Sequence, residues 1–175
     1  VSDFRQKEIA AGGEGAPLAP YAEALCFAVP GRSRILLNIG GIANFTWLPP
    51  EDASARWISG DTGPGNTLID AAVRKYLPER KEGFDRDGAL AARGEIDAEV
   101  LETLKAHPYF ARTFPKSTGP EEFGKAFFDT AAARVPAFGS ARGPALAAVF
   151  TRLAAETMAE AIRCTVSPLA GSELI

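Results

Sequence analysis

The chain has 175 residues, of which 46% are hydrophobic and 23% charged, and its formal net charge at neutral pH is −3. This composition is typical of a folded domain with a hydrophobic core, and the lack of a basic cluster disfavours binding to duplex nucleic acid. No apolar run approaches the roughly 18 residues of a transmembrane helix, and no signal-peptide pattern opens the chain. We therefore expect a cytoplasmic protein that does not bind membranes.

A structural zinc site is not expected. Cys26 and Cys164 lie far apart, no C-x-x-C motif occurs, and His107 is the one histidine of the sequence. Both cysteines stand in apolar surroundings, so we predict that they are reduced core residues. His107 precedes a proline in a loop-like stretch, and we predict that it is exposed to solvent.

The first 30 residues contain a loop rich in glycine and proline, "AAGGEGAPLAP", for which we expect irregular structure. The segment "RILLNIGGIANFTWL" then gives the clearest strand signal of the sequence. Its central Gly40-Gly41 pair is typical of a two-residue hairpin turn, so residues 34–39 and 42–48 are predicted to pair as antiparallel strands. A third strand is predicted at about 56–59.

Helices are predicted for the rest of the chain. Apolar residues at three- and four-residue spacing predict a helix over 64–77, with Pro64 in its first turn. Asp97 is the expected N-cap of a short helix, and two further helices are predicted over 121–134 and 144–166. A returning strand after them completes an α/β pattern.

The predicted hairpin carries an unusual polar pattern. Asn38 and Asn44 flank the Gly40-Gly41 turn, whose backbone N–H groups are not covered by side chains. Exposed main-chain donors of this kind bind phosphate in several folds. An ordinary tight hairpin is the alternative, and the local pattern favours it.

The heptad "GDTGPGN" at residues 60–66 follows the predicted third strand. We expect its carboxylate, Asp61, at the carboxyl edge of the sheet, where α/β folds open their ligand crevice. Gly63 and Gly65 would give a ligand close access to the backbone. The following helix N-terminus should keep Asp61 ionised, which suits a base better than an acid. The alternative is that Asp61 merely caps the turn or the helix.

The segment "PKSTGPEE" is a third candidate site. Lys116, Ser117 and Thr118 could together hold an anion or sugar hydroxyls ahead of a helix that starts near Glu121. The alternative is a simple helix entry with acidic residues in its first turn.

The segment "SDFR" near the start holds one further pair of charges. Asp3 and Arg5 could contact a polar substrate, although an exposed ion pair is the default interpretation.

Four stretches in this order, "SDFR…AAGGEGAPLAP", "LLNIGGIANFTWL", "GDTGPGN-x-LID" and "FPKSTGPEEF", resemble the middle of an anhydro-N-acetylmuramic acid kinase. The resemblance covers nearly the whole chain, and four motifs in register are more specific than any single one. It implies a partial actin-like ATPase domain of the ribonuclease H-like type. Residues 1–30 would then form the end of the first ATPase-fold domain together with the interdomain segment. Residues 31–175 would form the first part of the second ATPase-fold domain.

The resemblance also implies an activity. Such enzymes use ATP and Mg²⁺ to open 1,6-anhydro-N-acetylmuramic acid with water and to phosphorylate its oxygen 6, in the recycling of peptidoglycan. Asp61 would be the general base that takes a proton from the attacking water. Asn38, Gly40, Gly41 and Asn44 would form a phosphate-binding turn.

Other residues receive their roles from the same resemblance. The glycines at 63 and 65 would lie near the nucleotide phosphates. The sugar contacts would come from Asp3, Arg5, Lys116, Ser117 and Thr118. No direct protein ligand to the metal is expected.

The same resemblance predicts that the chain is a fragment, and it predicts the ligands and partners. The chain opens without methionine and lacks the family's G-T-S-x-D-G phosphate loop and S-G-G-G-A-x-N adenosine turn, so we expect a fragment that is inactive alone. An amino sugar and ATP are the expected ligands, and a homodimer is possible since the family often dimerises. Two alternatives remain: a non-catalytic fragment that binds a sugar or a partner, and a glycosidase that uses Asp61 with Asp70.

Overall fold

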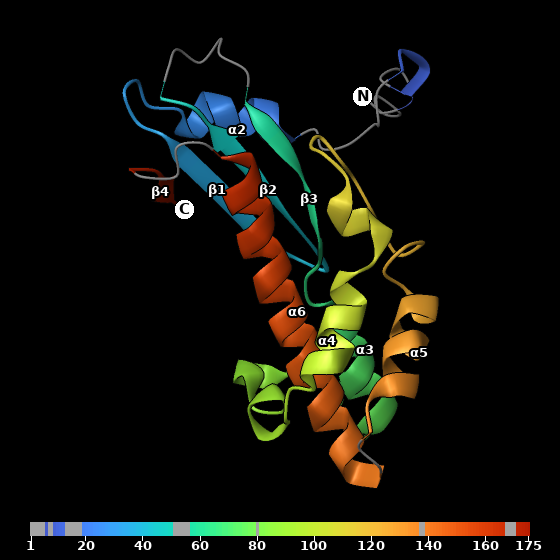
Figure 1. Cartoon of the computed structure of the whole chain (residues 1–175). Coiled ribbons are helices and arrows are strands. Elements are labelled where there is room, and N and C mark those ends of the chain that lie inside the picture. Colours follow the sequence, from blue (N-terminus) through green and yellow to red (C-terminus); the bar gives the residue numbers. More distant parts are fainter. Residues whose placement is uncertain are drawn as a thin grey trace.

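The computed structural model describes residues 6, 9–12, 19–50, 57–79, 81–136, 139–166 and 171–175. These residues form a mixed α/β fold in which a four-stranded sheet is combined with helices (Figure 1). The strands are β1 (Arg34–Ile39), β2 (Ile42–Leu48), β3 (Ile58–Pro64) and β4 (Glu173–Leu174). The α-helices are α2 (Ala19–Phe27), α3 (Thr67–Tyr76), α4 (Ala98–Lys105), α5 (Lys125–Arg134) and α6 (Arg142–Thr165). Short 3₁₀ turns are η1 (Arg86–Gly88), η2 (Ala91–Arg93), η3 (Pro108–Ala111) and η4 (Gly139–Ala141).

The strand order in the sheet is β3-β2-β1-β4. Strand β2 pairs antiparallel with both β1 and β3, whereas β4 returns parallel to β1. The hairpin register runs from Arg34 opposite Leu48 to Ile39 opposite Ala43. The predicted hairpin is therefore confirmed with its predicted bounds, because the Gly-Gly turn and the apolar alternation specify the same register.

Strand β3 is longer than predicted. It continues through the heptad to Pro64, and α3 begins only at Thr67, so the prediction of a helix from residue 64 is wrong at its start. Strand β2 provides pairing partners along the whole heptad, down to Ile42 opposite Pro64. Pro64 is tolerated because β3 is an edge strand of the described sheet, where a missing N–H breaks no ladder.

Helices cover both faces of the sheet. On one face Ile35 and Phe45 pack with Val166, next to the C-terminal half of α6. On the other face Leu36 and Leu48 pack against Ala24 of α2. Neighbouring residues thus point to opposite faces, as the strand period of two requires. Figure 1 shows the C-terminal half of α6 against the sheet and its N-terminal half among α3, α4 and α5.

The largest core cluster joins these helices. It contains Leu146, Val149, Phe150 and Leu153 of α6, which are at most 1% exposed. These residues recur at three- and four-residue spacing along one side of the helix, so the predicted helix over 144–166 is confirmed with bounds shifted by one or two residues. Asp97 is the N-cap of α4, as predicted, since its carboxylate accepts a hydrogen bond from the Val100 N–H at 2.9 Å.

Helix α5 begins at Lys125 rather than at residue 121. Phe123 is fully buried beside Tyr109, and the N–H groups of Glu122 and Phe123 both bond to the carbonyl of Gly119. These contacts form a turn over residues 119–123, so the helix starts only after it.

Three side-chain predictions are wrong. His107 is half-buried, with its ring centroid 5.4 Å from that of Phe127 and 5.5 Å from that of Phe123. Cys26 and Cys164 are free thiols on the surface. Cys26 lies in α2, where only Pro20 and Ala24 are buried. Apolar neighbours in the sequence were therefore not enough to predict that this cysteine is buried.

The tip of the hairpin closes onto the start of α3. The carbonyl of Gly41 accepts hydrogen bonds from the N–H groups of Gly65 and Thr67 at 2.9 and 3.2 Å, and the carbonyl of Gly40 accepts one from Asn66 at 2.9 Å. These bonds satisfy donors that a helix N-terminus otherwise leaves open. A Cβ atom on Gly65 would lie 2.3 Å from the Gly40 oxygen, so only glycine allows this approach.

We therefore expect Gly65→Ala to lower the free energy of unfolding by about 1–3 kcal/mol, because the added methyl group forces the hairpin tip away from α3. Urea titration followed by circular dichroism measures the change. Asn66→Ala is the matched control, since Asn66 is exposed and makes no side-chain cap, and we expect a change within about 0.5 kcal/mol. Equal stability of Gly65→Ala and the wild type would contradict this interpretation.

Candidate functional site

Three polar residues lie side by side across three strands. Asn38 of β1 is directly opposite Asn44 of β2, and Asn44 is directly opposite Asp61 of β3. Residues directly opposite one another share a face of the sheet. Their strand neighbour Phe45 faces α6, so this polar row lies on the other face of the sheet.

The polar row is accessible. Asn38 is exposed, and Asn44 and Asp61 are half-buried. The amide groups of Asn38 and Asn44 form no hydrogen bond with the residues that the structure describes. These two amides are therefore available to a ligand that reaches Asp61.

A bulge interrupts the pairing beside Asp61. The register between β2 and β3 shifts between Ala43 and Asn44, so Ala43 lies opposite Gly63 rather than Thr62. Thr62 is 1% exposed, and its hydroxyl donates to the Ala43 carbonyl at 3.1 Å. Bulges of this kind redirect side chains next to functional sites. The bulge separates Asp61 from the tightly packed end of β3.

Asp61 is held at three atoms by one later segment of the chain. Its N–H donates to the carbonyl of Lys116 at 2.8 Å, and its carboxylate Oδ2 accepts from the N–H of Thr118 at 2.9 Å. Its carbonyl accepts from the hydroxyl of Tyr109 at 2.7 Å. The carboxylate is thus fixed both in position and in direction.

The heptad glycines make room for neighbouring segments of the protein. A Cβ atom on Gly60 would lie 2.7 Å from the carbonyl oxygen of Lys116. Gly63 has a φ of +137°, and a Cβ atom there would lie 2.7 Å from the ring of Phe110. Together with Gly65, these glycines allow the close approach of the protein's own chain, and the Gly65 N–H is already bonded to Gly41.

The predicted sugar contacts divide into two groups. Thr118 and Ser117 are half-buried, and the N–H of Thr118 donates a hydrogen bond to the Asp61 carboxylate. Lys116, in contrast, is only 6% exposed, and its ammonium donates to the carbonyls of Tyr109 and Phe110 at 3.2 and 3.3 Å. Burial lowers the pKa of Lys116, and the nearby Arg112 lowers it further.

Two of the predicted sugar contacts cannot be placed. Asp3 and Arg5 lie outside the described residues.

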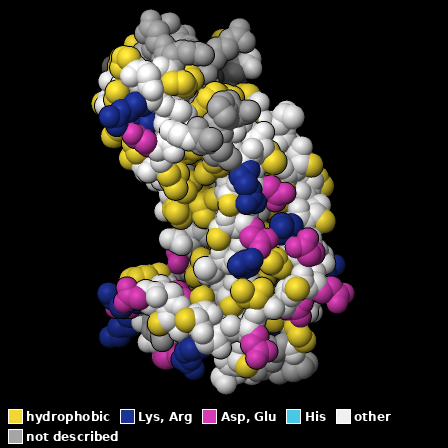
Figure 2. Space-filling view, turned by 60° about the vertical axis from the view of Figure 1, so that its left-hand side comes forward, with side chains coloured by type: hydrophobic (Ala, Val, Ile, Leu, Met, Phe, Trp, Pro, Cys, Tyr) yellow, Lys and Arg dark blue, Asp and Glu magenta, His cyan; other side chains and the backbone are white. Residues whose placement is uncertain are grey.

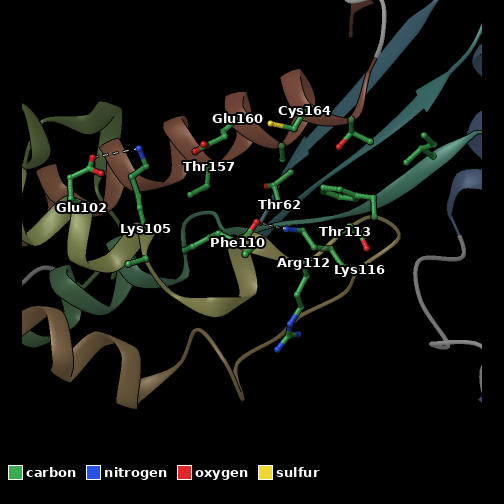
Figure 3. A pocket seen from close by; sticks show the side chains of 16 residues that line it. Thr62, Glu102, Lys105, Phe110, Arg112, Thr113, Lys116, Thr157, Glu160 and Cys164 are labelled. Atoms are coloured by element: carbon green, nitrogen blue, oxygen red, sulfur yellow. Dashed lines mark hydrogen bonds and ion pairs between the residues drawn. The ribbon is translucent and has the colours of Figure 1, made fainter.

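A cavity lies on the opposite face of the sheet from Asp61. It has a volume of about 780 Å³ and lies between α6, α4 and the segment that begins at η3 (Figure 3). Thr157, Glu160 and Cys164 point into it from α6 (Figure 3). Asp61 and the two asparagines do not line this cavity.

The charges around this cavity are largely paired. Lys105 contacts Glu156 at 2.8 Å and Glu102 at 3.5 Å, and the hydrogen bond that Lys105 donates to Glu156 raises the pKa of Lys105. Arg112, at the edge of the cavity, donates to Glu122 at 2.9 Å. Figure 3 shows its side chain extending away from α6. Lys116 and Glu160, which form no ion pair with the described residues, also line the cavity and carry one charge of each sign. The cavity therefore lacks the surplus of one sign that would attract an oppositely charged ligand.

Asp70, the second carboxylate of the glycosidase alternative, lies in the first turn of α3. Burial raises its pKa, and the positive charge of Arg74 partly opposes that rise. Its N–H bonds to the carbonyl of Asn66.

The described part of the chain offers no other obvious kind of site. It contains no group of three or more His, Cys, Asp or Glu residues placed to bind a metal. None of its helices is long and apolar enough to cross a membrane. On the face in Figure 2, lysine and arginine side chains are interspersed with aspartate and glutamate rather than gathered in a basic patch.

Sequence reasoning missed Tyr109. This tyrosine is fully buried, yet its hydroxyl reaches the backbone of Asp61, 48 residues earlier in the sequence. An aromatic residue in a proline-rich loop carries no local signal for such a contact. A buried tyrosine that needs a hydrogen-bond partner is the only general clue.

Comparison with known proteins supports one family. A sequence model of the family described as anhydro-N-acetylmuramic acid kinase matches residues 1–169. Relatives with that name are 50% identical in Shewanella baltica, over 129 residues, and 49% identical in Shewanella amazonensis, over 130 residues. Each match covers 74% of this chain and 34% of the relative. A relative of the same name in Pseudoalteromonas atlantica is 47% identical over 133 residues, which are 76% of this chain and 33% of the relative. The chain thus spans about a third of the length of these relatives.

The buried Lys116 leads to a prediction about pH. Because its pKa in the folded protein is below the ordinary value of 10.5, the unfolded state binds more protons between these two values, and stability rises with pH there. Lys116→Met removes this dependence. In urea titrations, we expect the difference in free energy of unfolding between the wild type and this variant to increase in favour of the wild type as the pH rises towards 10.5.

The exposed Lys81 provides the control for this prediction. Lys81→Met, measured in the same titrations, is the reference, because both substitutions remove one ammonium and only that of Lys116 is buried. A difference that falls with pH for Lys116→Met would show that this lysine is not desolvated.

Proposed function

This chain belongs to the anhydro-N-acetylmuramic acid kinase family, and we propose that it carries the catalytic base of an ATP-dependent kinase. The substrate would be 1,6-anhydro-N-acetylmuramic acid and the product N-acetylmuramic acid 6-phosphate, in the recycling of peptidoglycan. The observation that carries this proposal is the fixed carboxylate of Asp61 at the end of an accessible row of amides.

The proposed reaction joins two bond changes. Water attacks the anomeric carbon, its proton passes to the Asp61 carboxylate, and the bond between that carbon and oxygen 6 breaks. Oxygen 6 then takes the γ-phosphoryl group of ATP, and ADP leaves. Because the anomeric carbon acquires oxocarbenium character, a weak base is sufficient if it is well placed.

The surroundings of Asp61 suit that role. The Lys116 carbonyl and the Tyr109 hydroxyl fix its main chain, and the Thr118 N–H fixes its side chain. Orientation of a catalytic group before the reaction removes much of the entropic part of the barrier. A half-buried carboxylate on a rigid strand meets this requirement better than one on a free loop.

The hairpin supports a neighbouring site for the phosphates of ATP. Asn38 and Asn44 present amides beside Asp61, and hydrogen bonds to the start of α3 fix the tip at Gly40 and Gly41. We infer that these four residues contact the transferred phosphoryl group, since its transfer depends mainly on placement and charge neutralisation.

The proposed reaction uses ATP together with Mg²⁺. Bound Mg²⁺ would neutralise charge on the phosphates. We propose that Mg²⁺ binds mainly through phosphate and water oxygens, which it prefers as ligands.

The sugar would lie next to the loop that holds Asp61. Ser117 and Thr118 are the described candidates for contact with it, because they are half-buried beside the carboxylate. ATP is a cytoplasmic metabolite, so the proposal places the protein in the cytoplasm. A homodimer is part of the same proposal, and light scattering of the full-length protein measures it.

We expect Asp61→Asn to lower kcat of the full-length protein more than 100-fold, on the order of 3 kcal/mol of barrier, because the amide cannot accept the proton. The dissociation constant for the sugar should change less than about threefold, a difference below 1 kcal/mol. Coupled ADP release and calorimetry measure the two quantities.

Asp70→Asn is the control, with kcat within about threefold of the wild type, less than 1 kcal/mol. If Asp61→Asn kept its activity within about tenfold, or roughly 1.4 kcal/mol, Asp61 would not be the base. Ring opening without ATP, lost in both variants, would support the glycosidase alternative.

A further inference from the structure

Lys116 and Tyr109 form a connected support behind Asp61. The ammonium of Lys116 donates to the carbonyls of Tyr109 and Phe110, and the hydroxyl of Tyr109 donates to the carbonyl of Asp61. The carbonyl of Lys116 in turn accepts from the N–H of Asp61 at 2.8 Å. Lys116 and Tyr109 therefore hold the N–H and the carbonyl of Asp61, and the Lys116 ammonium connects these two supports.

This support is buried and closely packed. Tyr109 is fully buried, and the ammonium of Lys116 lies 4.6 Å from the centre of its ring and 4.9 Å from that of Phe114. Contacts of this kind between a cation and a ring stabilise a desolvated ammonium. The two ends of the segment 109–116 therefore contact each other, and both also bind Asp61.

The charge on Lys116 needs an explanation. Among the described residues it forms no ion pair, and burying an ammonium without a counter-ion is costly. An uncharged side chain of similar length could fill the same volume at lower cost. What only the ammonium provides is the pair of hydrogen bonds to the main chain of residues 109 and 110.

The side chain of Lys116 also lies away from the polar row. It lines the cavity on the α6 side together with Thr62, whereas Asp61 and the two asparagines do not (Figure 3). A sugar placed on Asp61 therefore meets the loop at Ser117 and Thr118 and not the Lys116 ammonium.

We propose that Lys116 and Tyr109 are positioning residues, which act through Asp61 without touching the sugar. The proposal rests on the function proposed above for Asp61. It replaces the sugar contact that the sequence predicted for Lys116. It also includes Tyr109, which the sequence analysis did not single out.

Kinetics of the full-length protein separate positioning from binding. Tyr109→Phe deletes one oxygen from a buried ring, and Lys116→Met deletes the ammonium while keeping an unbranched chain. In both variants we expect kcat to fall by about 10- to 100-fold, because a small displacement of the base is enough for such a loss. The KM for the sugar should stay within about twofold, since no sugar contact is removed.

Tyr76→Phe is the matched control. Tyr76 is half-buried in α3, and its hydroxyl makes no hydrogen bond with the described residues. Its kcat and KM should equal those of the wild type. Thermal unfolding of each variant shows whether a loss of kcat follows a loss of the fold.

Each outcome decides the proposal. Wild-type kcat in both variants overturns it, and a rise of KM above about fivefold with unchanged kcat in Lys116→Met restores this lysine as a sugar ligand. If Lys116→Met does not fold, Tyr109→Phe decides alone. Activity retained by Asp61→Asn rejects the proposed function instead, whereas an inactive Asp61→Asn beside two active support variants rejects only this inference.

Discussion

The hydrogen bonds between Asp61 and the segment 116–118 are the contacts on which the candidate site depends. They join an edge strand to a loop more than 50 residues later, through the Lys116 carbonyl and the Thr118 N–H. That loop is anchored in turn by the buried aromatic cluster of Tyr109 and Phe123, between α4 and α5. The helices inserted after α3 therefore stabilise the position of one carboxylate as well as the core.

Close approach of backbone segments explains the composition of the heptad. Gly60 admits the loop that carries Lys116, Gly63 admits the ring of Phe110, and Gly65 admits the hairpin tip. Three other parts of the chain therefore contact β3 and the turn after it within the six residues 60–65. The glycines thus surround Asp61 with rigid structure, while the polar face of the sheet beside Asn44 stays accessible.

Local patterns in the sequence predicted the hairpin and the Asp97 cap, because each depends on residues only a few positions apart. The extent of β3 was not predictable, since Pro64 reads as a helix start and only pairing with β2 makes it a strand residue. The burial of Lys116 and the hydrogen bond from Tyr109 to Asp61 were missed for a related reason. Both depend on long-range packing, which residue type and spacing do not encode.

The most direct test is a crystal structure of the full-length protein with the anhydro sugar and a non-hydrolysable ATP analogue. We expect an Asp61 carboxylate oxygen at roughly 3 Å from a water that faces the anomeric carbon, with the γ-phosphate near Asn38 and Asn44. A sugar bound on the far face of the sheet, in the cavity lined by Thr157 and Lys116, would put Asp61 out of reach and contradict its role as the base.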